Sequence, residues 1–330
     1  MAATGTTIEE LEDAGGQRPL FPEEKRRMLV IVNPYATTVF DRLKNLVVYA
    51  LRSRYEVEAI ETEARSHATE LCRQAARQGY DIVVAFDSDE TVNEAANGLA
   101  GSDTPLTCLP GGATNVFCRT LRIPADVVDA TEHLLRMADD FRPRRVDLGT
   151  VNGRCFVFGS GVGLDASVVE RVDRRPRLKA RLREWYFTYA AVTTFVRRYL
   201  VNPPRLRLEA DGREFEGVTL VVQNSDPFTY FGRQPLRVGA DAGLETGALS
   251  ATVLRRAGPL DLLTIVPRVL SGRAERVARH RHVESLGAVR SVRVTAAGPD
   301  RLPLEVDGDY LGDFEHVDYG VLPRALTVVA

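Results

Sequence analysis

The residues best suited to chemistry in this sequence lie between Asp87 and Glu94, where the chain reads DSDETVNE. Four acidic residues fall within these eight positions, directly after an apolar run, DIVVAF, that is typical of a buried strand. Carboxylate oxygens are ligands that Mg²⁺ prefers, whereas one or two acidic side chains are enough to stabilise the first turn of a helix. The stretch therefore predicts either a magnesium site or an acidic helix cap.

A second candidate is the stretch LPGGATN at 109–115, where two glycines follow another expected strand and open a helix. Free backbone N–H groups at such a helix start can hold an anion, and Thr114 or Asn115 could add side-chain hydrogen bonds. A simple glycine turn explains the same residues. Taken alone, the stretch leaves both interpretations open.

Two further turns give weaker signals. Asn33-Pro34 follows the first expected strand, and Asn-Pro is a common turn. The stretch VDGDYLGD at 306–313 places Asp307 and Asp309 on a turn that leads into the last strand. By itself this pattern predicts a hairpin.

The composition limits the classes of function. A chain of 330 residues allows roughly two domains, and 43 basic against 45 acidic residues give a net charge of −2. Only Lys25, Lys44 and Lys179 are lysines, so the many arginines indicate a coding bias rather than a nucleic-acid footprint. We therefore expect no nucleic-acid partner.

The cysteines and the amino-terminal residues favour the cytoplasm. The four cysteines form no CxxC pair and lie in apolar stretches, so they are expected to be buried thiols in a reducing compartment. Residues 1–27 lack the apolar core of a secretory signal and are expected to form a disordered tail. Since no run approaches the roughly 18 apolar residues of a membrane span, any membrane contact is expected to be peripheral, at the inner face.

From Met28 the sequence alternates β-branched runs with helical stretches. Strands are expected at 28–33, 55–60, 81–86 and 105–110, and helices at 40–52, 66–78, 91–99, 113–121 and 127–137. This alternation predicts an α/β domain with a doubly wound parallel sheet over 28–143. Such sheets bind their ligands at the carboxyl ends of the strands.

The pattern changes near residue 144. Alternating strands separated by Gly, Pro and Asp turns predict a β-rich, mostly antiparallel second domain over 144–317. Helical segments are expected to interrupt it near 176–200 and 260–271. Residues 318–330 are expected to return to the first domain.

In order and spacing, these motifs resemble the diacylglycerol kinase catalytic-domain family, the bacterial lipid kinases related to sphingosine kinases. The family pattern comprises an NP turn, GGDGTxNEVxNGL, LPxGTxND, FxxGxGxDAxVV and a terminal DGE or DGD before LPxAL. The matching stretches are Asn33-Pro34, DSDETVNEAANGL (87–99), LPGGATNVF (109–117), FGSGVGLDASVV (158–169), VDGDY (306–310) and LPRAL (322–326). The resemblance covers about residues 28–330 and implies the NAD kinase/diacylglycerol kinase-like architecture.

The resemblance also implies a function. The chain would use ATP and Mg²⁺ to phosphorylate the hydroxyl of diacylglycerol or a similar lipid at a membrane surface, with a homodimer left open. Asp309 matches the catalytic acidic residue and would take the proton from the lipid hydroxyl, and Asp89 would lie at the metal. The ATP-binding residues implied by the match are Asn33, Thr62, Ser88, Asp89, Glu90, Thr91, Asn93, Glu94, Gly112, Ala113, Thr114 and Asn115. An NAD or sugar kinase fits the NE…NGL and DGDY stretches less well.

The chain departs from the family at the GGDGT loop, where Asp87, Ser88 and Glu90 replace the three glycines. Glycines let the backbone approach phosphates and adopt conformations closed to other residues, and a strained non-glycine residue costs roughly 1–3 kcal/mol. A carboxylate about 4 Å from a phosphate charge adds repulsion of about 1 kcal/mol in water and about 4 kcal/mol at an effective dielectric of 20. The alternative function is therefore a catalytically impaired pseudokinase with a lipid-binding or regulatory role, unless the acids at 87, 89 and 90 jointly hold Mg²⁺.

Other departures are smaller. Ala113, Val116 and Arg122 replace a Thr, an Asp and a Gly of the family pattern, and Thr246-Gly247 stands where a structural magnesium loop usually has Asp-Gly. A second metal site is therefore in doubt. The arginine-rich stretch at 170–189 ends in an aromatic cluster, which suits either docking on an anionic membrane or a solvated helix whose aromatic residues join the core.

Overall fold

Four parallel strands form the core of the amino-terminal half in the computed structural model, which describes residues 25–34, 41–112, 114–163, 166, 205–299 and 301–330. The strands are β1 (Arg27–Val32), β2 (Glu56–Glu61), β3 (Ile82–Asp87) and β4 (Leu106–Pro110). They lie in the order β2-β1-β3-β4. Every residue of β3 and β4 is buried, as expected where helices cover both faces of a parallel sheet.

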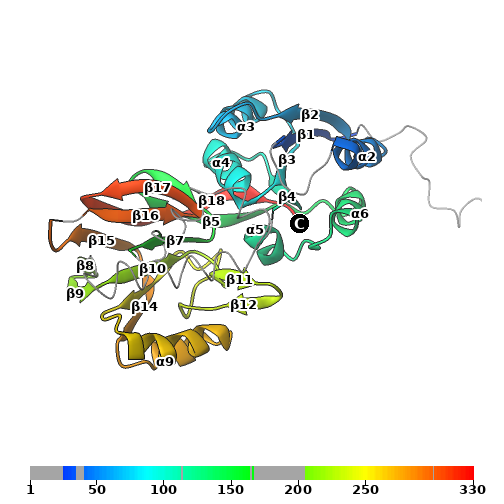
Figure 1. The fold of residues 1–330 in the computed structure, drawn as a ribbon. Coiled ribbons are helices and arrows are strands. Elements are labelled where there is room, and N and C mark those ends of the chain that lie inside the picture. The colour runs from blue at the N-terminus through cyan, green and yellow to red at the C-terminus, as the bar shows by residue number, and fades with distance from the viewer. Residues whose placement is uncertain (1–24, 35–40, 113, 164–165, 167–204, 300) are drawn as a thin grey trace, which may run out of the picture.

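The helices that cover this sheet are amphipathic. They are α2 (Asp41–Leu51), α3 (His67–Arg77), α4 (Asp89–Leu99), α5 (Val116–Thr120) and α6 (Val127–Met137). In α3 the buried residues are Ala68, Leu71, Cys72 and Ala75, a spacing that places them on one face. α3 and α4 pack together on one side of the sheet, and α2 and α6 lie on the other (Figure 1).

The second half of the chain is built mainly of antiparallel strands. Six of them form one sheet in the order β14-β13-β10-β7-β16-β17. In chain order these are β7 (Gly159–Val162), β10 (Thr219–Gln223), β13 (Leu249–Leu254), β14 (Val283–Val289), β16 (Leu302–Val306) and β17 (Asp309–Phe314). A hairpin of β11 (Thr229–Phe231) and β12 (Gln234–Leu236) and the helices α9 (Pro259–Leu270) and α10 (Ala274–Ala278) complete this half.

The remaining strands extend the amino-terminal sheet into the second half. They are β5 (Arg144–Val151), β6 (Arg154–Phe156), β8 (Leu206–Ala210), β9 (Arg213–Gly217), β15 (Ser291–Ala296) and β18 (His316–Val328). β18 is antiparallel to β15 and β5, and at Val328 it pairs parallel to Leu106 of β4. The carboxyl terminus therefore lies beside β4 (Figure 1), and one ten-stranded sheet runs through both halves.

The structure confirms the predicted fold class, a parallel α/β half followed by a β-rich antiparallel half. All four cysteines are free and buried, as predicted. Two helix starts differ from the predictions by two residues or more: α4 begins at Asp89 instead of Thr91, and α5 begins at Val116 instead of residue 113 because Asn115 adopts a left-handed conformation with φ 49°. Residues 1–24, the helical insert expected at 176–200 and the basic stretch at 170–189 lie outside the described residues.

Candidate active site

Two loops meet at the carboxyl ends of β3 and β4. The backbone N–H of Gly111 donates to the carbonyl oxygen of Asp87 at 3.0 Å. A Cβ atom placed on Gly112 would lie 2.9 Å from the Cβ of Ser88, closer than carbon atoms normally approach. Glycine at 112 is therefore required by the contact between the two loops.

Asp87 is a buried centre of hydrogen bonds, with 2% of its surface exposed. Its Oδ2 accepts hydrogen bonds from Asn33 Nδ2 at 2.9 Å, from Thr91 Oγ1 at 2.7 Å and from Ser88 Oγ at 3.2 Å. Asn33, Ser88 and Thr91, all predicted to bind ATP, are thus brought together by hydrogen bonds to the Asp87 carboxylate. The family pattern has a glycine at position 87. Asp87 fixes the ends of β1 and β3 relative to the start of α4.

The backbone at the three replaced glycines is unstrained, which corrects the expected conformational penalty. Asp87, Ser88 and Glu90 do not occur among the described residues with positive φ. Ser88 is extended, with φ −82° and ψ 173°, and stands as the N-cap of α4. Starting α4 two residues early places Asp89 and Glu90 in its first turn, where helical dihedrals suit any side chain. Only charge and hydrogen bonding then distinguish this loop from a glycine loop.

Three backbone donors near the start of α5, the N–H groups of Gly112, Val116 and Phe117, are already paired. Asp89 accepts from the N–H of Val116 at 2.9 Å and of Phe117 at 3.1 Å, one on each carboxylate oxygen. The N–H of Gly112 donates to Asn115 Oδ1 at 2.9 Å. A phosphate at this helix start would have to displace the chain's own oxygens.

The Asp89 side chain therefore points towards α5. If Asp89 bound Mg²⁺, the ion would compete with the two backbone N–H groups that its carboxylate already accepts from. The described part of the chain contains no group of three or more His, Cys, Asp or Glu side chains that could hold a metal. Burial raises the pKa of Asp89 to about 6, against hydrogen bonds from Val116 and Phe117 that lower it.

This pKa predicts a pH dependence of stability. Because the folded chain holds the Asp89 proton more tightly than the unfolded chain, with its ordinary value of 3.8, stability falls as pH rises from about 4 to about 6. The loss at this residue amounts to at most about 3 kcal/mol. Urea unfolding across this pH range should show the fall in the wild type and a smaller fall in Asp89→Asn. Parallel curves for the two proteins would contradict the assignment.

Asp309 lies opposite the first turn of α4. It is the first residue of β17 and is 7% exposed. Its Oδ1 accepts a hydrogen bond from Arg65 Nη2 at 2.6 Å, and Arg154 Nη2 lies 3.9 Å from its Oδ2. The same Arg65 nitrogen lies 3.7 Å from Glu90 Oε1. The turn at 306–310, predicted only as a hairpin from its own pattern, thus reaches the loops at the ends of β2 and β3.

Glu90 and Arg65 form the open side of this cluster, with side chains 43% and 70% exposed. Burial raises the pKa of Glu90, the neighbouring Asp309 raises it further, and Arg65 lowers it. Arg65 therefore offsets part of the negative charge that Glu90 brings in place of a glycine.

Asp307, two residues earlier, holds the site together. Its carboxylate accepts hydrogen bonds from the N–H groups of Val157, Phe158 and Gly159 and from Asn93 Nδ2, at 2.7–3.1 Å. Burial raises its pKa, while these hydrogen bonds lower it. Asn93 also accepts from Arg154 Nη2 at 2.8 Å. Asn93 is thus a link between α4 and the second half of the chain.

The remaining predicted residues lie at the edges of the cluster. Glu94 accepts from the N–H groups of Ser66 and Ala68 and so caps α3. Thr62 directly follows β2, with its N–H bonded to the carbonyl oxygen of Val32, and Thr114 is half-buried in the β4–α5 loop. Ala113 lies outside the described residues.

Sequence reasoning missed Arg65 and Arg154. Neither belongs to a family motif in this chain, and each reaches the acidic cluster from a turn or strand far away in sequence. The sequence indicated only that cations should lie near the acidic residues, because a cluster of buried carboxylates requires positive partners. It did not indicate which arginines these would be.

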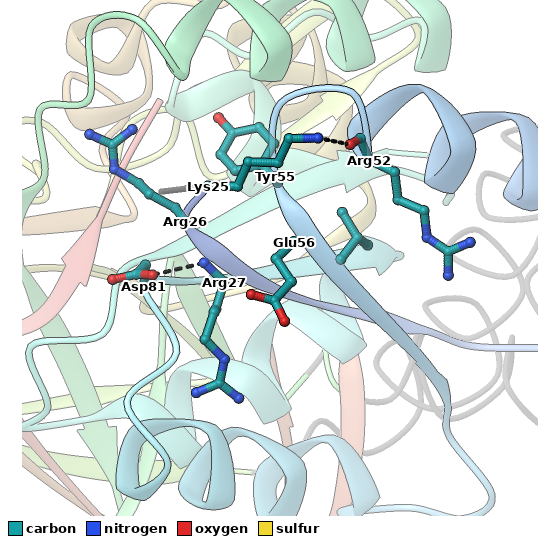
Figure 2. Close-up of a pocket in the computed structure, with 8 residues that line it drawn as sticks. Lys25, Arg26, Arg27, Arg52, Tyr55, Glu56 and Asp81 are labelled. Atoms are coloured by element: carbon teal, nitrogen blue, oxygen red, sulfur yellow. Dashed lines mark hydrogen bonds between the residues drawn. The ribbon is translucent and has the colours of Figure 1, made fainter. Parts of the chain in front are cut away.

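A separate cavity of about 850 Å³ lies at the opposite, amino-terminal end of β1. Figure 2 shows the basic side chains that line it, with the guanidinium groups of Arg26, Arg27 and Arg52 pointing in different directions. Arg26 lies over the Phe141 ring and Arg27 over the Tyr80 ring. These cations do not converge on one ligand position, and the cavity contains none of the predicted site residues.

A parallel α/β sheet continued into an antiparallel β-rich half, with an acidic residue of the second half facing loops of the first, defines the NAD kinase/diacylglycerol kinase-like architecture. Sequence profiles agree: the profile described as diacylglycerol kinase catalytic domain matches residues 27–151, and that described as YegS C-terminal NAD kinase beta sandwich-like domain matches residues 160–330. The chain belongs to the diacylglycerol kinase family of bacterial lipid kinases.

Individual relatives are distant but match along most of their length. A diacylglycerol kinase of Bacillus subtilis is 24% identical over 292 residues, covering 87% of this chain and 91% of the relative. One of Staphylococcus haemolyticus is 26% identical over 287 residues, covering 86% and 82%. A crystal structure of a diacylglycerol kinase from Bacillus anthracis has a TM-score of 0.63 at 19% identity, covering 93% of this chain and 98% of that chain.

Proposed function

We propose that this protein is a lipid kinase that transfers the γ-phosphate of ATP to the hydroxyl of diacylglycerol or a similar lipid. The observation that carries the proposal is the position of Asp309. Its buried carboxylate lies against Arg65 and beside the first turn of α4, at the carboxyl ends of β2 and β3. Parallel sheets bind their ligands at this edge, so Asp309 stands where an acceptor hydroxyl would meet a nucleotide phosphate.

In the reaction, Asp309 accepts the proton of the lipid hydroxyl as the hydroxyl oxygen attacks the γ-phosphorus. Arg65 is placed to assist, because its exposed side chain can turn from Asp309 to the transferred phosphate. Arg154 and Asn93 position the turn that carries Asp309, through Asp309 itself and through Asp307. The proton then lies on Asp309 and the phosphate on the lipid oxygen, with ADP as the leaving group.

Magnesium would enter with the nucleotide. Mg²⁺ is usually held by one or two carboxylates together with substrate phosphates. Asp89, the metal ligand that the resemblance implies, would take this role by giving up hydrogen bonds to the start of α5. When bound, the ion would neutralise phosphate charge. Its presence would also reduce the repulsion between the phosphates and Glu90.

The lipid acceptor implies work at a membrane. Among the described helices, none is both long enough and apolar enough to cross a bilayer. We place the protein in the cytoplasm, acting at the inner membrane face.

The direct test is an assay of the purified protein with radiolabelled ATP and diacylglycerol in mixed micelles. Phosphatidic acid should form in a magnesium-dependent reaction. With NAD as the acceptor, no phosphorylation should occur. Failure to label the lipid above background would exclude the proposed function.

A second candidate function is that of a pseudokinase with a lipid-binding or regulatory role. It is favoured by the backbone N–H groups near the start of α5 that are already hydrogen-bonded within the chain. The N–H groups of Gly112, Val116 and Phe117 are all bonded within the chain. A pseudokinase of this kind should show no magnesium-dependent stabilisation by ATP in a thermal-shift titration, whereas the kinase should.

The charge at position 90 should limit nucleotide affinity. Replacing Glu90 by Gln removes about 1 kcal/mol of repulsion towards a phosphate, which corresponds to roughly fivefold tighter binding of Mg-ATP. Calorimetric titration measures this change. Glu70→Gln, an exposed acid on α3 bonded to Gln74 and Arg77, is the matched control and should bind like the wild type. Unchanged or weaker binding in Glu90→Gln would show that Glu90 holds the metal or lies outside the nucleotide site.

A further inference from the structure

An exposed apolar stripe runs along α9, at the end of the molecule away from the amino-terminal sheet (Figure 1). Leu260, Leu263, Val266 and Leu270 have exposed fractions of 74%, 72%, 46% and 45%. At about 100° per residue these four side chains fall within about 120° of the helix circumference. Ile265, on another side of the helix, is buried in the cluster that contains Val277 and Val283. α9 thus has one apolar side in the core and a second apolar side in solvent.

The chain around α9 is strongly basic although the whole protein carries a net charge of −2. Residues 255–282 contain seven arginines and only two acidic residues, Asp261 and Glu275. Asp261 is already bonded to Arg281 and to the Gly258 N–H. Exposed arginines without an ion pair in the described part of the chain stand before and after the helix: Arg255, Arg256, Arg273, Arg276 and Arg279.

A second copy of the chain is a poor partner for this surface. A helix of 12 residues is about 18 Å long, whereas a stable interface usually buries about 800 Å² on each partner. Two copies meeting across a two-fold axis would also bring the same arginines together, because such an interface pairs a patch with itself. The charge therefore favours an anionic partner that can take up exposed leucines.

We propose that α9 and its flanking arginines form a surface that docks on an anionic lipid bilayer. An apolar helix side next to arginines matches the acyl boundary and the headgroups of such a bilayer. The inference rests on the proposed function and deepens it, because a kinase that acts on a membrane lipid has to be held at the bilayer. Docking itself requires neither ATP nor phosphoryl transfer, so the two proposals can fail separately.

The experiment is co-sedimentation of the full chain, without nucleotide, with vesicles of phosphatidylcholine alone or mixed with phosphatidylglycerol. The wild type should bind the mixed vesicles, bind pure phosphatidylcholine less, and bind less at high salt. Leu260→Ser/Leu263→Ser should bind the mixed vesicles roughly tenfold more weakly or worse. The matched control is Leu46→Ser/Val128→Ser, which changes residues 58% and 66% exposed on α2 and α6 and should bind like the wild type.

Two further measurements complete the test. Arg273→Glu/Arg276→Glu should remove the preference for phosphatidylglycerol, and Leu260→Ser/Leu263→Ser should keep the wild-type activity on diacylglycerol in detergent micelles. The proposal is overturned if the wild type binds neither kind of vesicle, if the leucine variant binds like the wild type, or if light scattering shows a dimer that the leucine variant loses. If the protein binds vesicles but phosphorylates no lipid, the docking proposal is supported and the proposed kinase function is wrong.

Discussion

Replacing Asp309 by Asn is expected to lower the turnover number for lipid phosphorylation by about 10²- to 10⁴-fold, the usual contribution of a general base. The amide is close in size to the carboxylate and can still accept a hydrogen bond from Arg65, but it cannot take a proton from the lipid hydroxyl. Binding of Mg-ATP should not weaken, because the substitution removes a negative charge that would repel the phosphates. Turnover is measured in the micelle assay, and nucleotide affinity by calorimetry.

The matched control for this change is Asp313→Asn. Asp313 lies on the same strand, exposed, where it accepts a hydrogen bond from the Tyr310 hydroxyl. Its replacement should leave turnover unchanged. If Asp309→Asn retained wild-type turnover, the base would have to be another residue and the proposed mechanism would be wrong.

Replacing Asp307 by Ala is expected to lower the free energy of unfolding by about 3–5 kcal/mol, the usual effect of removing one partner from a buried charged network. Three backbone N–H groups and the Asn93 amide lose their acceptor. Asp307 also has φ 48°, a left-handed conformation that alanine adopts less readily than Asp or Asn. Urea denaturation monitored by circular dichroism measures the change.

Asp307→Asn separates the two causes. Asparagine tolerates the same backbone conformation and keeps one acceptor oxygen, so it should destabilise the protein less than alanine does. Asp313→Ala, outside the buried network, should change stability by no more than about 0.5 kcal/mol. An Asp307→Ala protein as stable as the wild type would show that other groups hold this turn.

The fold could be predicted from sequence because its signals are local. A short stretch of sequence is enough to specify each element. β3 is indicated by its apolar run, and α3 by the helical spacing of its apolar residues. The helix starts were harder, since α4 begins at Asp89 only because Ser88 adopts an extended N-cap conformation. α5 begins late because Asn115 is left-handed, and residue type favours these conformations at Ser88 and Asn115 without specifying them.

The site could be predicted only in part. Matching motifs identified Asp309 and the loops at 87–94 and 109–115, but they could not show which oxygens those loops had already engaged. The side chain of Asp89 accepts hydrogen bonds from the start of α5, and Asp87 accepts hydrogen bonds from Asn33 and Thr91. The roles of Arg65 and Arg154 depend on contacts between segments far apart in the chain, which spacing does not encode.

The long strand β18 limits how far the two halves of the molecule can move relative to each other. It is hydrogen-bonded to β15 at one end and to β4 at the other, with β5 along most of its length. Swinging one half of the molecule about the other would have to break these main-chain bonds together, so the two halves keep the relative position that they take when the polypeptide folds. Asp309 therefore keeps its position relative to the loops at the ends of β2 and β3, and adjustments to a ligand fall to individual side chains such as the exposed Arg65.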